Sequence, residues 1–277
     1  MQLGKRDLVW SYLAQFLSVA YGIIILPIVL RYLTENEVGF YFILLSVASF
    51  VALIDFGFTP QFSRNITYVY SGSRNLLKEG IDVATAQKNN DIDYGLLCTV
   101  IATARRTYGI LAWVALAIMA TIGTGYIYRV TDGFMSVDAA EWIWGLFGLA
   151  IFFNLRFAYY NMLLIGSGQV RKAQQAIVAS RVLQIIAAYV VLYLGYGLLG
   201  WVCVYLFVPF VQRTLMYMFY FTKELRARIG EYRITRDERK ELFKILWHNS
   251  KRGGLCKLAE FTTSQVVVLI AGVFLSL

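Results

Sequence analysis

The chain has 277 residues, of which 58% are hydrophobic, 16% aromatic and only 16% charged, with a mean hydropathy of +0.59. Soluble domains carry about 25% charged residues, so this composition excludes an ordinary soluble domain and indicates a membrane protein. The formal net charge is +9, but the basic residues gather between apolar segments, which favours contact with an anionic membrane surface over nucleic acid.

Apolar segments of about 20 residues, the length needed to cross the hydrocarbon, recur along the chain. We expect an all-α polytopic helix bundle of about seven transmembrane helices. The first six would form an N-terminal lobe over residues 1–222, a basic cytoplasmic connection would occupy residues 223–254, and the last span would begin a second lobe. The predicted spans are residues 9–30, 38–58, 108–128, 142–165, 176–196, 198–221 and 255–277.

The basic residues of the connections predict the orientation of the bundle. Nearly all of them lie on the same side as the N-terminus, and the opposite connections hold only Arg31 and Arg129. Connections rich in Lys and Arg stay in the cytoplasm, so we expect a cytoplasmic N-terminus. Residues 223–254 predict a basic amphipathic helix that lies on anionic lipid or, alternatively, docks a partner protein.

Polar residues follow one face of the first span. Ser11, Gln15, Ser18 and Gly22 are spaced by four, three and four residues, which places them on one side of a helix. Such a face either packs closely against another helix or lines a cavity.

Charged and amide side chains recur at membrane depth in the later spans, where a charge is costly. Arg156 lies far from both ends of its predicted span, so its side chain is not expected to reach the interface. Because arginines outnumber acids at this depth, we expect a wet, cationic interior that binds an anion through bidentate guanidinium contacts. The alternative is that Arg181, Arg213 and Lys257 extend to the interface from the helix ends. The expected cavity residues are Gln15, Asn154, Arg156, Arg181, Gln184 and Arg213.

Two acidic residues near span ends need an explanation. Asp55 closes the second predicted span, about four residues before the next polar segment at Thr59. Either solvation at the interface makes its cost small, or the residue has a structural role. At the start of the seventh span, Lys257 and Glu260 are three residues apart and are expected to pair.

Nothing in the sequence predicts catalysis. Cys98, Cys203 and Cys256 are far apart and lack metal or redox spacing, and His248 is the only histidine. No paired carboxylates or nucleophile–base set appear. We therefore expect neither an enzyme nor a bound cofactor or metal.

The stretch RYLTENEVGFYFILLSVASFVALIDFGFTPQFSRNI, residues 31–66, resembles the signature of bacterial polysaccharide flippases. These are the O-antigen and capsule branch of the multidrug/oligosaccharidyl-lipid/polysaccharide exporter superfamily. The resemblance rests on an acid–glycine turn at Glu37 and Gly39, and on Asp55 and Gly57 followed by Arg64. The segment LLIGSGQVRKAQ, residues 163–174, resembles the exit from the fourth span of that family.

The resemblance implies a function and partners. Such proteins move undecaprenyl-pyrophosphate-linked oligosaccharides from the cytoplasmic to the outer leaflet of the inner membrane, for lipopolysaccharide and other surface glycans. They have twelve or fourteen helices in two lobes around a cationic cavity. The resemblance implies that Arg64 lies at the cytoplasmic mouth of this cavity and that Asp55 and Gly57 form a close-packed helix end. Lipid-linked oligosaccharide, membrane lipids and the polysaccharide assembly machinery are the implied partners.

The sequence leaves three hypotheses about the function of the chain. Since the chain ends near the seventh span, we expect a fragment of the flippase that does not transport alone. A multidrug and toxin extrusion-type transporter, coupled to cations, is an alternative, although cationic drugs would favour acids where this sequence has arginines. A membrane protein that scaffolds glycan assembly without transporting is the other alternative.

Overall fold

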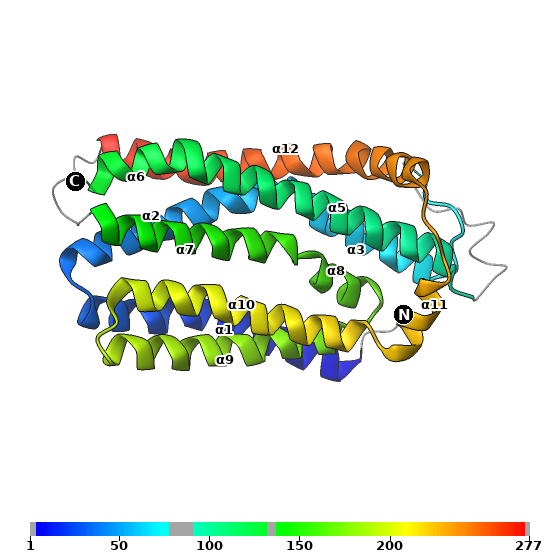
Figure 1. The fold of residues 1–277 in the computed structure, drawn as a ribbon, viewed down its shortest axis with the longest axis horizontal. Helices are drawn as coiled ribbons and strands as arrows, with labels where there is room; N and C mark the ends of the chain where they lie inside the picture. The colour runs from blue at the N-terminus through cyan, green and yellow to red at the C-terminus, as the bar shows by residue number, and fades with distance from the viewer. Residues whose placement is uncertain (1–3, 78–90, 132–136, 275–277) are drawn as a thin grey trace.

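The computed structural model describes residues 4–77, 91–131 and 137–274, and for residues 130–131, 137 and 260–274 only the course of the backbone. All regular structure in these residues is helical, as the composition predicts. The helices lie along the long axis of the molecule, with α1, α9 and α10 on one edge and α5 and α12 on the other (Figure 1). Their bounds are α1 (Lys5–Tyr32), α2 (Glu35–Ala52), η1 (Leu53–Asp55), α3 (Phe58–Tyr70), α5 (Tyr94–Ile118), η2 (Met119–Gly123), α6 (Thr124–Thr131), α7 (Val137–Arg156), α8 (Tyr159–Gly166), α9 (Val170–Tyr193), α10 (Gly197–Tyr220), α11 (Lys223–Gly230) and α12 (Arg236–Phe274).

Six helical segments in the described residues are long and apolar enough to cross a membrane. They coincide with the first six predicted spans, and many of their large apolar side chains face outward, as expected of a surface in contact with lipid. The seventh predicted span falls in the second half of α12, most of whose side chains lie outside the described set. The six segments are Lys5–Tyr32, Glu35–Asp55, Tyr94–Arg129, Asp138–Gly166, Val170–Tyr193 and Gly197–Tyr220.

The second span is broken. The helix tightens into η1 at Leu53–Asp55 and then stops, because Phe56 (φ 43°) and Gly57 (φ 75°) both adopt the left-handed conformation. The chain then re-enters a helix as α3, which the sequence did not predict. At the far end of α3, the Tyr70 hydroxyl lies 3.2 Å from that of Tyr220. Burial raises the pKa of Tyr70, so its hydroxyl stays neutral at physiological pH.

The third span extends well beyond its apolar part. Helix α5 begins at Tyr94, where the Asp93 side chain accepts a hydrogen bond from the backbone N–H of Leu96 (2.9 Å). The predicted span began at Tyr108, and the amphipathic segment expected to lead into it, with Arg105 and Arg106, is continuous with the span in one helix. This segment is stable in the protein because its other side packs on α3, α8 and α11.

Helix α12 runs without interruption from Arg236 to Phe274. The predicted basic connection and the predicted seventh span are therefore joined in one helix, and the boundary expected between residues 254 and 255 lies inside it. Instead of lying apart from the first lobe, α12 packs on α3 and α5. Gly253 and Gly254 lie where α12 meets the break at Gly57.

The apolar core has two parts. One lies between α1, α2, α7, α9 and α10 and contains Trp201, whose ring meets that of Tyr41 edge-on at 4.8 Å. The other lies between α3, α5, α8, α10 and α12 and contains Phe62 and Tyr108, with ring centres 6.1 Å apart. The second part holds the basic end of the bundle together and positions the groups described next.

Candidate functional site

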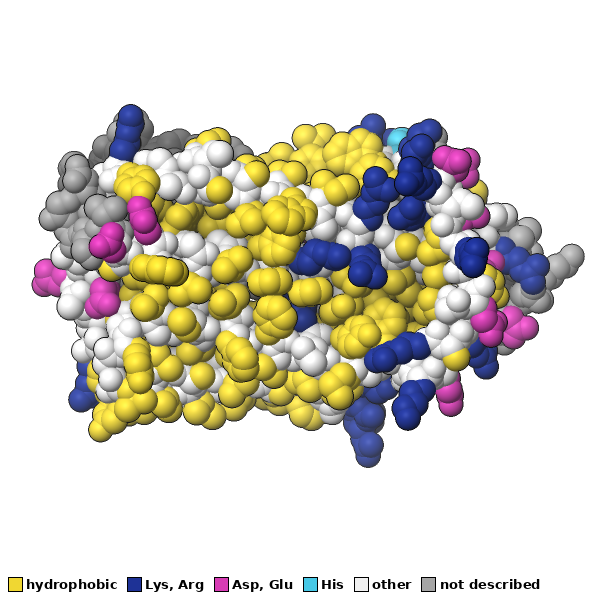
Figure 2. All heavy atoms as spheres, in the orientation of Figure 1, with side chains coloured by type: hydrophobic (Ala, Val, Ile, Leu, Met, Phe, Trp, Pro, Cys, Tyr) yellow, Lys and Arg dark blue, Asp and Glu magenta, His cyan; other side chains and the backbone are white. Residues whose placement is uncertain are grey.

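A cavity of about 590 Å³ opens between α5, α8, α10 and α11. Figure 2 shows Lys and Arg side chains gathered over this half of the molecule, while the other half is largely apolar. Three arginines from three helices line the cavity, and no Asp or Glu is among its lining residues. The polar and aromatic lining includes Arg105, Arg156, Tyr160, Arg213 and Tyr217.

A break between α7 and α8 positions Arg156. Helix α7 ends at this residue and α8 begins at Tyr159, with an i to i−3 hydrogen bond from the Ala158 N–H to the Leu155 carbonyl (3.1 Å) at the junction. Arg156 reaches across to α5, where its Nη1 donates to the backbone carbonyl of Arg105 (3.1 Å). The fourth predicted span is therefore interrupted after Arg156, although the residue still lies inside the apolar segment Asp138–Gly166.

Arg213 lies on α10, and a hydrogen bond to Asn154 of α7 holds its side chain in place. Its Nη2 donates to the Asn154 side-chain oxygen (3.1 Å), and its Nη1 lies 3.7 Å from the Met216 sulfur. The buried Nε has no hydrogen-bond partner among the described residues. A buried donor without a partner is costly, so this guanidinium has capacity to donate a further hydrogen bond to an acceptor on a ligand. Asn154 acts here as a positioning residue.

Aromatic rings form the apolar wall of the cavity. Phe157 and Tyr160 are stacked with centroids 5.8 Å apart, and Tyr160 meets Tyr217 at 5.4 Å. The Arg156 guanidinium lies 5.8 Å from the centre of the Phe157 ring, within the range of a cation–π contact. These rings lower the local dielectric and so strengthen the attraction between the arginines and an anion.

The other expected cavity arginines lie elsewhere. Arg181 on α9 donates to the buried Gln184 side chain (2.8 Å) and lies 5.2 Å from the ring of Tyr21 on α1. Arg64 is exposed on α3, beside Tyr68 at 5.9 Å. Neither residue lines the cationic cavity. The structure thus brings together Asn154, Arg156 and Arg213 and separates them from the rest of the predicted set.

The polar face of the first span is only partly covered by the described residues, with Ser11 and Ser18 half-buried. Gln15 is exposed, and a Cβ added at Gly22 would meet no atom within 4 Å. The Ser11 and Ser18 hydroxyls donate to carbonyls of their own helix, each at 2.8 Å. Within the described part of the chain, this face lies at the edge of the side of α1 that packs on α9, and it does not line the cationic cavity.

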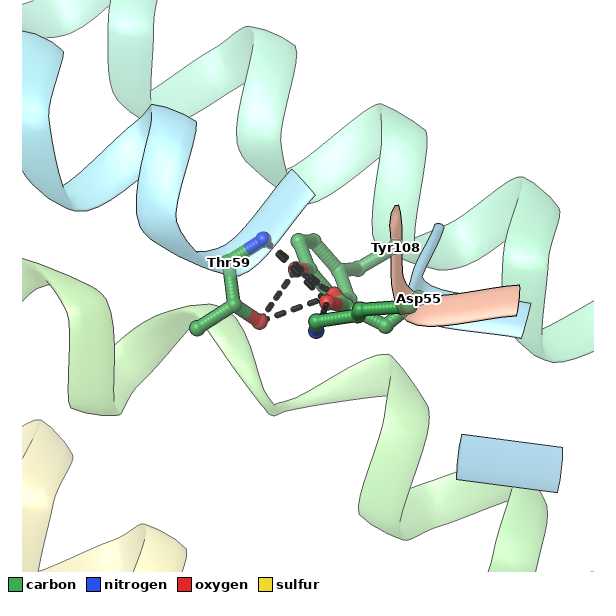
Figure 3. Close-up of polar contacts among 4 residues, drawn as sticks. Asp55, Thr59 and Tyr108 are labelled. Carbon is green, nitrogen blue, oxygen red and sulfur yellow. Dashed lines mark hydrogen bonds and ion pairs between the residues drawn. The ribbon is translucent and has the colours of Figure 1, made fainter. Parts of the chain in front are cut away.

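Asp55 lies at the centre of a polar cluster that joins three helices (Figure 3). Its carboxylate accepts hydrogen bonds from the Thr59 hydroxyl (2.8 Å), the Thr59 backbone N–H (3.2 Å) and the Tyr108 hydroxyl. Its other oxygen forms an ion pair with Lys257 of α12 (3.1 Å). The Asp55 side chain is only 13% exposed, so protein partners stabilise it, and solvation at the interface does not account for it.

The ion pair gives Lys257 a partner that the sequence did not suggest. The predicted partner was Glu260, whose side chain lies outside the described residues, whereas the observed partner Asp55 is 202 residues away. Gly57 permits the approach of α12, because a Cβ there would lie 3.0 Å from the backbone of Gly254. Asp55 and Gly57 thus form a close-packed helix junction.

The acid–glycine turn has a capping role. Glu37 and Thr34 form a capping box at the start of α2, with the Thr34 N–H donating to Glu37 Oε2 (3.0 Å). Glu37 Oε1 also accepts from the backbone N–H of Leu198 (2.9 Å), in the first turn of α10. One carboxylate therefore stabilises two helix N-termini. Gly39 is exposed and has open space beside it.

Sequence reasoning missed Arg105 and Tyr108 as members of these two sites. Both lie in the amphipathic first part of α5, where the sequence predicts a helix leading into the third span but not which of its side chains meet other helices. The buried residues Leu97, Ile101, Ala104 and Tyr108 lie three or four positions apart, and this spacing marks the packed face of the helix. No pattern in the sequence could reveal the pairing of Asp55 with Lys257.

Comparisons with known proteins give no relative. No family model, no curated protein and no solved structure matches the chain. The resemblance to the flippase signature therefore remains an interpretation of the motifs.

Proposed function

We propose that the chain binds the pyrophosphate of a lipid-linked oligosaccharide and serves as a six-helix lobe of a flippase in a bacterial inner membrane. The observation that carries this proposal is the convergence of Arg105, Arg156 and Arg213 on one acid-free, aromatic-lined cavity. Guanidinium groups donate paired, charge-assisted hydrogen bonds that match phosphate oxygens. Aromatic faces beside them provide an apolar surface for the first sugar.

The depth of the cavity also supports a lipid-linked substrate. Arg156 lies 18 residues from Asp138, the start of its span, which corresponds to about 27 Å of helix. The hydrocarbon is about 30 Å thick, so the arginines lie near the level of the phosphates of one leaflet. The pyrophosphate of a lipid-linked oligosaccharide would therefore contact the arginines while it stays at the depth of the lipid phosphates. Alternating access requires two halves, of which the six-helix unit would supply one.

A multidrug and toxin extrusion-type transporter is the second candidate. Its supporting observation is Asp55, a largely buried carboxylate of the kind that could exchange a coupling cation. However, Asp55 already pairs with Lys257, and no acid lines the cationic cavity. The arginines of the cationic cavity would therefore repel a cationic drug.

A binding experiment tests the proposal. The purified chain in nanodiscs would be titrated with undecaprenyl-pyrophosphate-linked oligosaccharide and with the same glycan on an uncharged lipid. We expect Arg156→Ala or Arg213→Ala to weaken binding of the pyrophosphate lipid roughly tenfold or more, since a hydrogen bond to a charged group contributes about 1.5–3 kcal/mol. Arg156→Lys should restore binding only in part, because an ammonium lacks the bidentate geometry.

Arg171→Ala is the matched control, because Arg171 is exposed on α9 outside the cavity. It should bind like the unaltered chain. Equal affinity for the charged and uncharged lipids, or unchanged binding by both cavity variants, would exclude the phosphate site. Retained capture of glycan-assembly proteins by variants that no longer bind the lipid would favour the scaffold alternative.

A further inference from the structure

A second basic groove lies on the opposite side of α5 from the cationic cavity. Arg105 lines the cavity, whereas the next residue, Arg106, lines a groove of about 340 Å³ between α5 and α12. From α12, Arg239, Lys240 and Lys244 line it, and no acid is among its lining residues. Figure 2 shows Lys and Arg side chains gathered over this part of α5 and α12.

The positive charges of the groove are largely uncompensated. Lys240 forms an exposed ion pair with Asp237 at 3.5 Å, a contact that contributes little to stability. Arg239 has a buried Nε without a hydrogen-bond partner among the described residues. Such a donor lacks the partner that buried polar groups normally have. The groove therefore has the positive charge that an anion requires, and the hydrogen-bonding capacity of Arg239 is not used up by the described residues.

Apolar residues continue the groove toward the membrane. Ile110 and Phe243 line it beside the cations, and Trp113 lies one turn further along α5 with 63% of its surface exposed. Arg106 lies 23 residues from Arg129, the other end of its span, or about 35 Å along the helix. This distance slightly exceeds the hydrocarbon thickness of about 30 Å, which places Arg106 at headgroup level and Trp113 at hydrocarbon level.

We propose that this groove binds the phosphate headgroup of an anionic phospholipid, with an acyl chain along Ile110 and Trp113. Basic pockets between membrane helices on the cytoplasmic side bind such headgroups. A soluble phosphate would use the same cations but would leave the exposed apolar stripe unused. Because the groove is formed by α5 and α12 together, the bound lipid connects these two helices. The proposal does not depend on what the cationic cavity carries.

Native mass spectrometry and thermal unfolding of the full chain test this site. In nanodiscs, replacing a quarter of the phosphatidylcholine by phosphatidylglycerol should raise the unfolding temperature and leave phosphatidylglycerol bound after release from the disc. Arg106→Gln/Arg239→Gln should lose most of this shift and bind the lipid at least tenfold more weakly. Lys244→Gln alone, which removes an exposed charge, should lose part of it.

Arg171→Gln/Lys223→Gln is the charge-matched control, since both residues are exposed and line neither basic site. It should keep the full shift. An equal loss in this control would overturn the proposal in favour of non-specific attraction to the membrane surface. An equal shift from inorganic phosphate in phosphatidylcholine discs would overturn it in favour of a soluble anion. An unchanged shift in the Lys244→Gln and Arg106→Gln/Arg239→Gln proteins would exclude the groove altogether.

Discussion

Asp55 joins three helices through one carboxylate. Its donors come from Thr59 at the start of α3, Tyr108 on α5 and Lys257 on α12. The four donors are directed at two oxygens, so the hydrogen-bonding capacity of the carboxylate is well used in a largely buried position. The main effect of this residue is therefore to fix the break between η1 and α3 against its neighbours.

A double-mutant cycle measures this effect. Asp55→Asn should destabilise the protein by about 1–3 kcal/mol, because the amide presents a donor where Thr59 and Tyr108 also donate. Lys257→Met should cost less, about 1 kcal/mol or under, because the lysine side chain is 43% exposed and water screens the pair. Unfolding midpoints of the two single variants and the double variant give the coupling energy.

The exposed Asp138 supplies the control for that cycle, and Asp138→Asn should leave the unfolding midpoint unchanged. If Asp55→Asn also left the unfolding midpoint unchanged, the carboxylate would not stabilise the junction between η1, α3 and α12. Strict additivity of the Asp55 and Lys257 variants would show that the ion pair has no energetic role.

At the scale of elements, the hydropathy of the sequence predicted the six spans because each contains enough apolar residues to cross the hydrocarbon. It failed where helices continue beyond the membrane. The first turns of α5 and all of α3 are amphipathic, and they fold through packing around Phe62 and Tyr108. Such tertiary support cannot be read from a window of hydropathy. The unbroken course of α12 through two glycines was missed for the same reason.

The sequence indicated a cavity lined by arginines, but it did not indicate correctly which residues line it. Arginine-rich spans indicated an anion site, and Arg156 and Arg213 do converge with Asn154. Which arginines meet depends on the breaks at Arg156 and at Phe56, and neither break contains a proline. Arg181 lies on the α1 side of the bundle with Gln184, a separation that depends on how the helices are arranged and not on their periodicity.

Two glycines of the flippase-like motif should respond in opposite ways to alanine. Gly57 has φ 75° and backbone atoms of α12 at 3.0 Å from an added Cβ, so Gly57→Ala should cost about 1–3 kcal/mol and loosen α12. Gly39 lies in α2 with open space beside it. Gly39→Ala should be neutral or stabilise by up to about 1 kcal/mol, because alanine favours the helix.

Thermal unfolding together with hydrogen exchange over residues 236–259 distinguishes these outcomes. Faster exchange in α12 of the Gly57→Ala protein, with unchanged exchange in α1, is the expected pattern. Uniformly faster exchange would indicate a global loss of stability and no specific role at the α12 crossing. Equal effects at Gly39 and Gly57 would contradict the packing explanation.

At the scale of the whole molecule, the long helices divide the bundle into an apolar part and a basic end (Figure 2). Helices α5, η2 and α6 together run from Tyr94 to Thr131, which is longer than the hydrocarbon requires. The excess lies at the basic end, together with α3, α11 and the first half of α12. Both basic sites lie at the transition, where lipid phosphates are expected.

This arrangement predicts which end faces the cytoplasm. Segments rich in Lys and Arg remain inside, so the starts of α11 and α12 should be cytoplasmic and the starts of α2 and α7 external. Single cysteines at Glu35, Asp138, Glu224 and Glu238 would be placed in a chain whose own Cys98, Cys203 and Cys256 are replaced by alanine. In intact cells an impermeant maleimide should label positions 35 and 138 at once, and positions 224 and 238 only after permeabilisation. Labelling of all four from outside would overturn the orientation, and with it the placement of both arginine sites at the cytoplasmic leaflet.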